Sequence, residues 1–269
     1  MVVKNFKRVE LKYRINSTEK ERLILGLSKY MKFDEFGKTT ISSAYLDTDN
    51  WDIISRSIEK PMYKEKLRIR CYDYPNAQDP VFLELKKKYD GVVYKRRVTL
   101  SRAAAEMFVL GTSYKDAINL APLKDEQLQN NLYMPNNLQI ANEIMAFMEW
   151  HNHPKVKVIT SCDRFSFKLK DEFINNSNFK EFEKNLRITV DSNLWYCDVD
   201  KSGIYFKDED FSRLIPSSDS ILEIKCIGGI PIWLNNILNS EKIYPTSFSK
   251  CGTAVEKIWK DKLLGKGVA

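Results

Sequence analysis

Lysine and arginine alternate with apolar residues in several strand-like runs of this chain, and no other feature limits its fold as much. In residues 66–70 (Lys-Leu-Arg-Ile-Arg) the even positions are cationic and the odd positions are apolar. Residues 8–15 alternate in the same way, with Glu10 among the cations. Because successive side chains of a strand point to opposite faces, each run has one apolar face and one charged face. The pattern indicates strands that bury one side and collect cations on the other.

Turn signals predict that many of these strands are joined by hairpins. Asp90-Gly91 is a two-residue hairpin signal between two of the alternating runs. The predicted strands are 4–15, 40–47, 62–73, 79–88, 92–100, 155–161, 163–170, 186–191, 195–199, 203–207 and 220–226.

A smaller number of helices is predicted between the strands. Asn16, with Glu19 three residues later, is typical of a capping box, and the helix that it begins should end near Tyr30. Residues 121–136 are predicted to be a loop and residues 171–185 a polar connector. Further helices are predicted at 101–110, 114–120, 138–150 and 253–264.

These elements predict an α+β protein with mainly antiparallel strands. No composition break separates domains, so we expect a single domain over residues 1–269. If the apolar faces pack outward against helices, the cationic faces line an interior. The expected architecture is a closed, tunnel-like β-barrel of about eight strands with helices packed outside.

The charge of the chain favours a polyanionic partner. The net charge is +7 and the pI is about 9.0. Two like charges ~6 Å apart cost roughly 3 kcal/mol at an effective dielectric of ~20, so clustered cations favour an anionic guest. The alternative is that each charged face simply meets water. That alternative is favoured for any single strand, but it weakens when several strands carry the same sign. No recognition motif for nucleic acid is present, so nucleic acid is not the expected partner.

The cysteines and the hydropathy pattern suggest an intracellular protein. The five cysteines are scattered and form no Cys-x-x-Cys pair, which predicts reduced thiols with neither a disulfide framework nor a zinc site. No apolar run is long enough to span a bilayer, and the first residues lack a signal-peptide pattern. We therefore expect a cytoplasmic location.

Nine short motifs carry a resemblance to a known family. In chain order they are Arg8-Val-Glu10-Leu-Lys12-Tyr13, Tyr45-Leu-Asp47-Thr48, Lys66-Leu-Arg68-Ile-Arg70, Phe82-Leu-Glu84-Leu-Lys86, Val93-Tyr-Lys95-Arg-Arg97, Asp163-Arg164, Arg187-Ile-Thr189-Val-Asp191, Leu222-Glu223-Ile-Lys225 and Phe248-Ser249-Lys250. Together they resemble the VTC domain, the polyphosphate polymerase catalytic domain of the vacuolar transporter chaperone complex. That domain is part of the triphosphate tunnel metalloenzyme (CYTH-like) superfamily.

The resemblance implies a metal-dependent enzyme that transfers the terminal phosphoryl group of ATP to a growing polyphosphate chain inside a basic tunnel. Glu223 would bind the metal, Mn²⁺ or Mg²⁺. The residues that it would place in catalysis are Lys12, Arg68, Arg70, Lys86, Lys95, Arg164 and Lys250. Further substrate contacts would come from Arg8, Glu10, Arg97, Arg187, Lys225 and Ser249. The partners would be ATP and polyphosphate or triphosphate. Any export of the product would need a membrane partner in trans.

Two departures from the superfamily pattern favour the polymerase branch. Hydrolytic members of the superfamily carry Glu-x-Glu-x-Lys in the first strand and a second Glu-x-Glu late in the chain. Here Arg8 and Ile221 stand where two of those carboxylates would be. Two alternatives stay open, namely an inorganic or nucleoside triphosphatase of the same fold and a non-catalytic polyphosphate-binding module.

Overall fold

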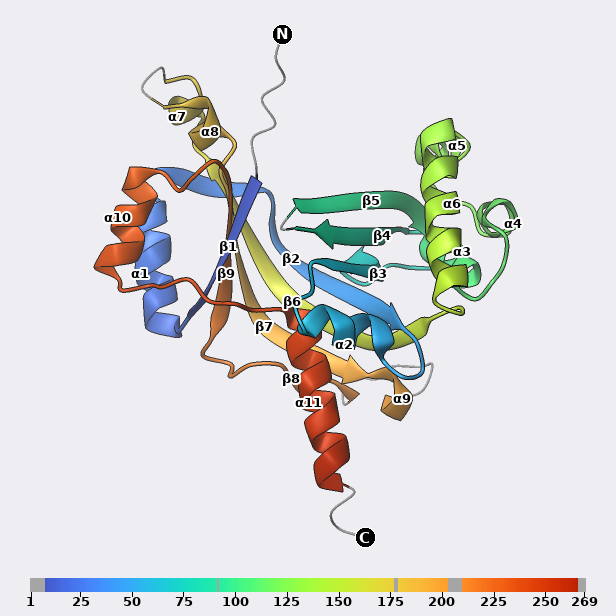
Figure 1. The fold of residues 1–269 in the computed structure, drawn as a ribbon. Helices are drawn as coiled ribbons and strands as arrows, with labels where there is room; N and C mark the ends of the chain where they lie inside the picture. The colour runs from blue at the N-terminus through green and yellow to red at the C-terminus, as the bar shows by residue number, and fades with distance from the viewer. Residues whose placement is uncertain (1–7, 91, 177–178, 203–209, 266–269) are drawn as a thin grey trace. The chain divides into compact units, whose positions relative to one another are not determined.

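The structure, a computed structural model, describes residues 8–90, 92–176, 179–202 and 210–265 (Figure 1). The chain divides into two compact units, and each is made of segments that are distant in the sequence. Unit 1 comprises residues 1–40, 162–195 and 213–249, and unit 2 comprises residues 41–161, 196–212 and 250–269. The predicted strand over 203–207 lies outside the described residues.

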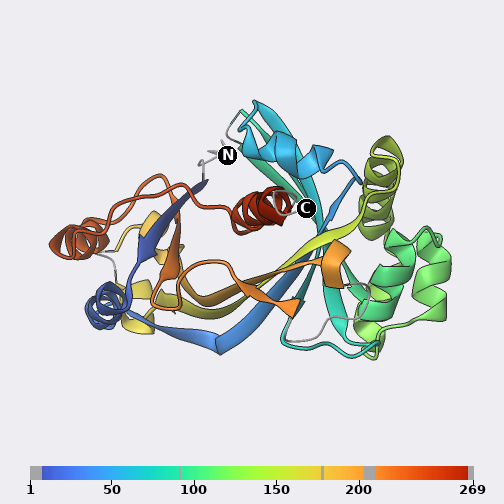
Figure 2. The same cartoon turned by 90° about the horizontal axis from the view of Figure 1, so that it is seen from below.

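Unit 1 contains the N-terminal strand and two helices that cover it. The capping box at its first helix is present as predicted, because the Asn16 side chain accepts from the Glu19 N–H and Glu19 accepts from the Asn16 N–H. Helices α1 and α10 lie side by side in Figures 1 and 2. Gly26 of α1 permits this close approach, because a Cβ at that position would lie only 3.0 Å from the side chain of Ile237 in α10. The elements that lie wholly in unit 1 are β1 (Arg8–Ile15), α1 (Ser17–Leu27), α7 (Asp171–Ile174), α8 (Glu181–Lys184), β9 (Ser220–Ile227) and α10 (Ile232–Ser240).

Unit 2 contains a three-stranded meander with a group of helices beside it, which Figure 2 shows from below. Helices α3 and α6 pack against β4 and β5 through a shared apolar core. The elements that lie wholly in unit 2 are α2 (Asp52–Ile58), β3 (Tyr63–Tyr72), β4 (Pro80–Tyr89), β5 (Val92–Ser101), α3 (Arg102–Val109), α4 (Tyr114–Leu120), α5 (Glu126–Asn131), α6 (Pro135–Trp150), α9 (Val199–Ser202) and α11 (Lys250–Gly265). No helix within the described ranges combines the length and the apolar character needed to cross a membrane.

Three long strands, β2 (Met31–Asp47), β6 (Lys155–Leu169) and β7 (Arg187–Asp198), contribute residues to both units. The hydrogen-bonded strand order is β1-β9-β7-β6-β2-β3-β4-β5, and the short strand β8 (Ser212–Arg213) pairs with β7. The mainly antiparallel α+β class is therefore confirmed. The pairing among described residues does not close the sheet into a barrel, so the closed barrel is not confirmed.

Each unit has its own apolar core. In unit 1, Leu222 and Ile224 of β9 pack with Leu23 of α1. In unit 2, Leu83 and Leu85 of β4 pack with helices α3, α4 and α6. Both cores lie on the apolar faces that the alternation predicts. The prediction of a single domain over residues 1–269 stays a prediction.

Several boundaries differ from those read from the sequence. The strand predicted at 40–47 begins at Met31, and the two strands predicted over 155–170 are one strand, β6. The two strands predicted over 186–199 are likewise one strand, β7. Because cross-strand pairing continues through polar and small residues, the local breaks in the apolar pattern do not end these strands. Residues 121–136 and 171–185 are not wholly irregular as predicted, because the first stretch contains α5 and the second contains α7 and α8. Helices α2, α9 and α10 also fall in stretches for which no helix was predicted.

The Tyr45-Leu-Asp47-Thr48 motif lies at the end of β2, just before α2. The Asp47 carboxylate is fully buried and accepts hydrogen bonds from the N–H groups of Thr48 (2.8 Å), Ile53 (2.9 Å) and Ile54 (2.8 Å). Ile53 and Ile54 belong to the first turn of α2, where N–H groups have no carbonyl partner within the helix, so the carboxylate stabilises the helix start. Asp47 therefore has a structural role that accounts for its place in the motif.

Candidate functional site

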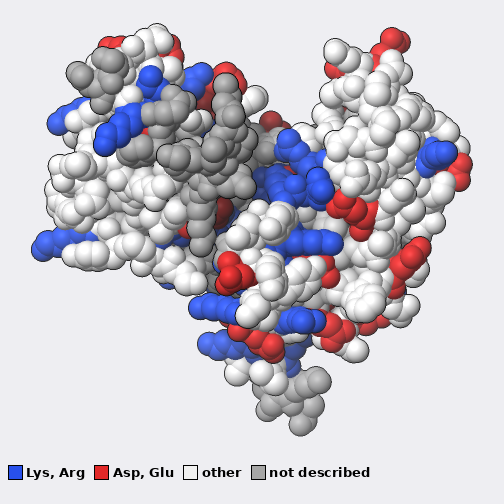
Figure 3. Space-filling model, turned by 45° about the horizontal axis from the view of Figure 1, so that its top comes forward, with Lys and Arg blue, Asp and Glu red and all other residues white. Residues whose placement is uncertain are grey.

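The cationic face of unit 2 lies on β3, β4 and β5. In the antiparallel register Lys64 is opposite Lys88, Lys66 is opposite Lys86, and Arg68 is opposite Glu84. On the next strand Lys95 is opposite Lys86 and Arg97 is opposite Glu84. The residues that share this face are Lys64, Lys66, Arg68, Arg70, Glu84, Lys86, Lys88, Lys95 and Arg97. Eight cations therefore accompany one carboxylate. Figure 3 shows a group of blue Lys and Arg side chains near the middle of the view, with red carboxylates beside it.

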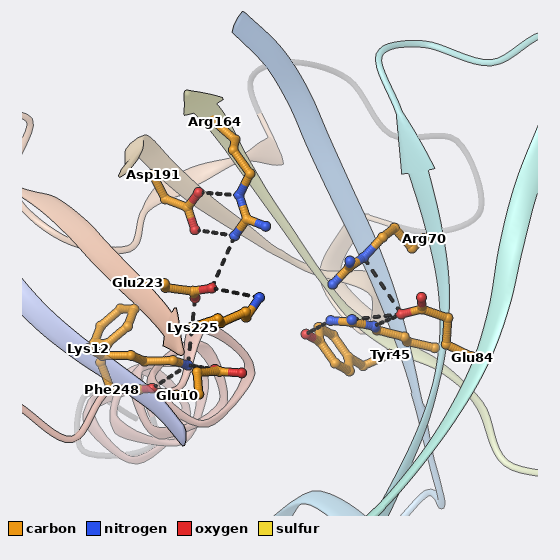
Figure 4. Close-up of polar contacts among 11 residues, drawn as sticks. Glu10, Lys12, Tyr45, Arg70, Glu84, Arg164, Asp191, Glu223, Lys225 and Phe248 are labelled. Atoms are coloured by element: carbon orange, nitrogen blue, oxygen red, sulfur yellow. Dashed lines mark hydrogen bonds and ion pairs between the residues drawn. The ribbon is translucent and has the colours of Figure 1, made fainter. Parts of the chain in front are cut away.

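Glu84 organises the inner part of this face (Figure 4). Its carboxylate is 1% exposed and accepts from the guanidinium of Arg68 at 2.8 Å (Nε) and 2.7 Å (Nη2). Arg70 Nε lies 3.7 Å away, Arg97 Nη1 lies 3.8 Å away, and the Lys95 ammonium forms an ion pair with the same carboxylate. Burial opposes the ionisation of Glu84, but Arg68, Arg70 and Lys95 outweigh it and lower its pKa to about 2. Glu84 is thus ionised at neutral pH, and the face still carries a large excess of positive charge.

Arg68 is held from two sides. Its Nη1 donates to the Tyr45 hydroxyl at 3.0 Å, and Tyr45 is a buried residue of β2. Burial lowers the pKa of Arg68, but Tyr45 and Glu84 more than offset this and raise it. Burial raises the pKa of Tyr45, whereas Arg68, Lys66 and Arg70 lower it, and the net direction is downward. An arginine has five N–H donors, so the three contacts of Arg68 leave two for a ligand.

A second polar face lies in unit 1 on β1, β9 and β7. Lys12 is opposite Glu223, and Lys225 lies between Glu10 and Arg187 in the register. Glu223 is 6% exposed. Its carboxylate lies 3.7 Å from Lys12, 3.7 Å from Lys225 and 3.4 Å from Arg164 (Figure 4).

Arg164 is fixed by a fully buried aspartate. Its Nε and Nη2 donate to the two oxygens of Asp191 at 2.6 and 2.7 Å. Burial lowers the pKa of Arg164, but Asp191 and then Glu223 raise it above its ordinary value. This forked geometry fixes the orientation of the guanidinium plane.

The chain segment before α11 joins this second face. The Lys12 ammonium donates to the Phe248 carbonyl at 3.1 Å and lies 3.5 Å from Glu10. Ser249 follows Phe248 directly, and Lys250 is the first residue of α11. The side chain of Arg8 lies outside what the structure describes.

The predicted site residues thus fall into two groups. Arg68, Arg70, Lys95 and Arg97 surround Glu84 in unit 2, with Lys86 two residues farther along β4. Glu10, Lys12, Arg164, Arg187, Lys225 and Glu223 lie together in unit 1. Their roles toward a ligand stay predictions.

Sequence reasoning did not name Tyr45, Glu84 and Asp191 as site residues. The alternation that puts cations on one face of a strand also puts Glu84 and Asp191 there, so a signal for both carboxylates was present. Nothing local to Tyr45 indicates its partner, because Arg68 is 23 residues away.

The carboxylates of unit 1 fit a divalent cation that is also held by phosphates. Within the described part of the chain, no group of three or more His, Cys, Asp or Glu residues could hold a metal ion alone. The Thr189 hydroxyl, opposite Glu223 in the register, is buried and has no hydrogen-bond partner among the described residues. A buried hydroxyl without a partner costs free energy, so a ligand beside Glu223 would satisfy it. Mg²⁺ is commonly bound by one or two carboxylates together with substrate phosphates, and this donor set suits that mode.

Three solved structures resemble the chain at low sequence identity. A putative adenylate cyclase from Vibrio parahaemolyticus has 10% identity and a TM-score of 0.39, with 91% of this chain and 94% of that chain covered. A putative adenylyl cyclase from Hippeastrum, described as having a dominant triphosphatase activity, has 14% identity and a TM-score of 0.45, with 93% and 96% covered. A conserved hypothetical protein from Pyrococcus furiosus has 11% identity and a TM-score of 0.38, with 90% and 97% covered. These similarities are too weak to support an inference about this chain.

No curated protein matches the sequence. The VTC domain family, in contrast, matches residues 7–259, which include both polar faces and nearly the whole chain. The chain belongs to the VTC domain family.

Proposed function

We propose that this protein is a metal-dependent polyphosphate polymerase that transfers the terminal phosphoryl group of ATP to a polyphosphate chain. The observation that carries the proposal is the face of β3, β4 and β5, where eight cations accompany the single carboxylate Glu84. That excess is unfavourable without an anion of high charge density. Membership of the VTC domain family supports a phosphate chain as that anion.

The arginines have the geometry to hold phosphoryl oxygens. Glu84 and Tyr45 fix Arg68, and Asp191 fixes Arg164, so each guanidinium is oriented before a ligand arrives. Phosphoryl transfer requires mainly positioning and neutralisation of charge on the transferring group, which are tasks that fixed cations perform. Arg68, Arg70, Lys86 and Lys95 would hold phosphates in unit 2, and Lys12, Arg164 and Lys250 would complete the set that the family resemblance implies.

Glu223, with Glu10 as its neighbour of like charge, would hold Mn²⁺ or Mg²⁺. When bound, the cation would neutralise negative charge on the phosphate oxygens. Lys12 lies within 3.7 Å of Glu223 and 3.5 Å of Glu10, so it balances the two carboxylates. Arg187, Lys225, Arg97 and Ser249 would add contacts to the substrate.

Incubation of the purified protein with ATP and Mn²⁺, followed by gel electrophoresis of the products, tests the proposal. Phosphate chains that require both ATP and metal are the expected result. Orthophosphate as the sole product would instead identify a triphosphatase, and tight binding of polyphosphate without turnover would identify a binding module. The cytoplasmic location and a membrane partner in trans stay predictions.

A further inference from the structure

Aromatic side chains lie at the end of the cationic face that is remote from the β4–β5 turn. Phe82 lies two residues before Glu84 on β4, and Tyr72 lies two residues after Arg70 on β3. Because side chains alternate between the two faces of a strand, both rings lie on the same face as Arg70 and Glu84. In the register Phe82 is directly opposite Arg70. The rings are therefore neighbours of a residue that is expected to hold phosphate.

Phe82 connects Tyr72 with Arg97, and we call these three residues the aromatic platform. Tyr72 and Phe82 make an edge-to-face contact, with ring centroids 5.6 Å apart and planes at 85°. The guanidinium carbon of Arg97 lies 4.4 Å from the centroid of the Phe82 ring. Phe82 is partly buried, whereas Tyr72 is 39% exposed and the Arg97 side chain is 44% exposed. The platform thus presents a ring and a guanidinium that a ligand can reach.

Arg70, beside the platform, has a buried donor that lacks an acceptor. Its Nε has no hydrogen-bond partner among the described residues, and the Glu84 carboxylate lies 3.7 Å away (Figure 4). A buried N–H without a partner costs free energy, and an oxygen of a bound phosphate would satisfy it. Opposite Cβ atoms in an antiparallel pair are about 4.5–5.5 Å apart, so a phosphate on Arg70 would lie next to the Phe82 ring.

Aromatic rings are confined to this end of the cationic face. The two rows on the other side of Glu84 contain only lysine and valine, namely Lys66, Lys86 and Lys95, and then Lys64, Lys88 and Val93. The tyrosines near the β4–β5 turn, Tyr63, Tyr89 and Tyr94, lie on the opposite face of the sheet. The two ends of the face therefore differ in chemistry, because only the end at Arg70 combines cations with rings.

A phosphate group that is linked to a flat heteroaromatic ring would use both features. Bases stack on aromatic side chains and on the guanidinium plane of arginine, and arginine also binds phosphate oxygens. Phe82 is two residues from Glu84, which is ~7 Å along the strand. A nucleoside triphosphate is a ligand of this kind, since a ribose joins its phosphates to the base. An inorganic phosphate chain has no group that would contact the rings.

We propose that Tyr72, Phe82 and Arg97 form a subsite for the base of a nucleoside triphosphate, which stacks on the aromatic platform while Arg68 and Arg70 hold its phosphates. The nucleoside lies toward the start of β4, and the phosphates extend from it toward Glu84. The proposal rests on the proposed function in taking ATP as the phosphoryl donor. It adds a direction for the donor and the residues that recognise its base.

Calorimetric titration with ATP and with tripolyphosphate tests the subsite, and EDTA in the buffer removes divalent cations so that no turnover occurs. In Tyr72→Leu we expect the affinity for ATP to fall about tenfold, because a stacking surface is lost. The affinity for tripolyphosphate should stay within about twofold, because this ligand has no base. Tyr72→Phe keeps the ring and should bind both ligands as the wild type does.

Tyr89→Leu is the matched control, because it removes an exposed tyrosine from the opposite face of β4. It should leave both affinities unchanged. Phe82→Leu should also weaken ATP binding about tenfold or more, since Phe82 contacts both other members of the platform. This second variant serves if Tyr72→Leu does not fold, which thermal unfolding without ligand would show.

Four results would overturn the subsite: no binding of ATP by the wild type, unchanged affinity of Tyr72→Leu for ATP, a parallel loss for ATP and tripolyphosphate, or the same loss with Tyr89→Leu. A single-stranded oligonucleotide that binds more tightly than ATP, and is lost in Tyr72→Leu, would assign the platform to nucleic acid and would also overturn it. A triphosphatase would show the same binding pattern as a polymerase. The base subsite and the polymerase activity can therefore fail separately.

Discussion

At the scale of single residues, the structure depends on a few buried carboxylates that hold cations in fixed orientations. Glu84 and Asp191 are almost completely buried. Arg164 contacts both oxygens of Asp191, whereas Nε and Nη2 of Arg68 contact one oxygen of Glu84. Such ion pairs contribute little net stability compared with apolar packing, but removal of one partner leaves a buried charge without compensation. Their value for a phosphate-binding protein lies in the orientation of the arginine.

Glu84→Gln should destabilise the protein in a pH-dependent way. The pKa of Glu84 is lowered from 4.5 to about 2 in the folded state. The folded state therefore binds fewer protons, and this stabilisation is present above about pH 4.5 and is lost as the pH falls toward 2. A tenfold change in the proton dissociation constant corresponds to ~1.4 kcal/mol, so ionised Glu84 stabilises the folded state by about 3 kcal/mol.

Urea unfolding at pH 7, 4 and 3 measures this contribution. We expect the free energy of unfolding of the variant to be lower than that of the wild type by about 3 kcal/mol at pH 7, with the difference shrinking as the pH falls. Glu106→Gln, at a position whose side chain is 51% exposed, is the control. A difference that does not depend on pH would show that the cations do not stabilise the ionised form of Glu84.

Tyr45→Phe should weaken phosphate binding through Arg68. Phenylalanine keeps the buried ring but removes the hydroxyl that accepts from Arg68 Nη1 at 3.0 Å. Loss of a hydrogen bond to a charged group should lower the affinity for tripolyphosphate about tenfold. Because the pKa of Tyr45 is lowered, its hydroxyl should ionise at a lower pH than that of a free tyrosine. The phenolate would then compete with phosphate for Arg68, so the affinity of the wild type should fall as the pH rises.

Calorimetric titration across pH 7 to about 10 measures both effects, since free tyrosine titrates near ~10. The variant should lack the alkaline loss of affinity. Tyr94→Phe, at an exposed position on the opposite face of the sheet, should behave as the wild type does. Equal affinity and equal pH profiles for the wild type and Tyr45→Phe would contradict a positioning role for Tyr45.

At the scale of elements, each strand of the polar faces is amphipathic in a way that separates stability from binding. Leu83 and Leu85 of β4 are buried in the core of unit 2. Glu84 and Lys86, which alternate with them along the strand, lie on the cationic face. Substitutions on one face should therefore change stability, and substitutions on the other should change affinity. The ends of the elements are stabilised separately, as the buried Asp47 at the start of α2 shows.

Asp47→Ala should destabilise the protein by about 3 kcal/mol or more. Three N–H groups, those of Thr48, Ile53 and Ile54, would lose their acceptor, and two of these residues are buried. Chemical denaturation compared with Asp49→Ala, at a position whose side chain is 80% exposed, measures the effect. Equal midpoints for the two variants would show that α2 does not depend on this carboxylate.

At the scale of the whole molecule, the chain has two apolar cores, one in each unit, and three strands that contribute to both. The sequence predicts a single domain over residues 1–269. Because β2, β6 and β7 belong to both units, loss of one unit would shorten strands in the other. We therefore expect the two cores to unfold together.

Leu222→Ala and Leu83→Ala test this expectation, since each removes a fully buried side chain from one of the two cores. Each variant should lower the free energy of unfolding by about 2–5 kcal/mol and shift a single transition. Thermal unfolding followed by circular dichroism and by calorimetry measures it. Two resolved transitions, with each variant moving only one of them, would show that the units unfold independently.

Much of the fold could be predicted because strand alternation is a local property. The period of two placed Lys66, Arg68 and Arg70 on one face and Leu67 in the core. The Asn16–Glu19 capping box is equally local and was also predicted. In contrast, β6 and β7 were each divided in two, because their continuity depends on pairing with neighbouring strands and not on their own residues. Helix α10 was missed because it follows glycines and Pro231, which locally favour a loop.

The sequence by itself determined the chemical character of this protein, with cations collected on one face of several strands and membership of the VTC domain family indicated by ordered motifs. Only the tertiary structure decided which cation meets which carboxylate or carbonyl. Arg164 meets Asp191 across 27 residues, and Lys12 meets Phe248 across 236. The direction of a side chain along a strand follows from the local backbone. Its partners depend on strand register and chain topology, which arise from contacts between segments far apart in the sequence.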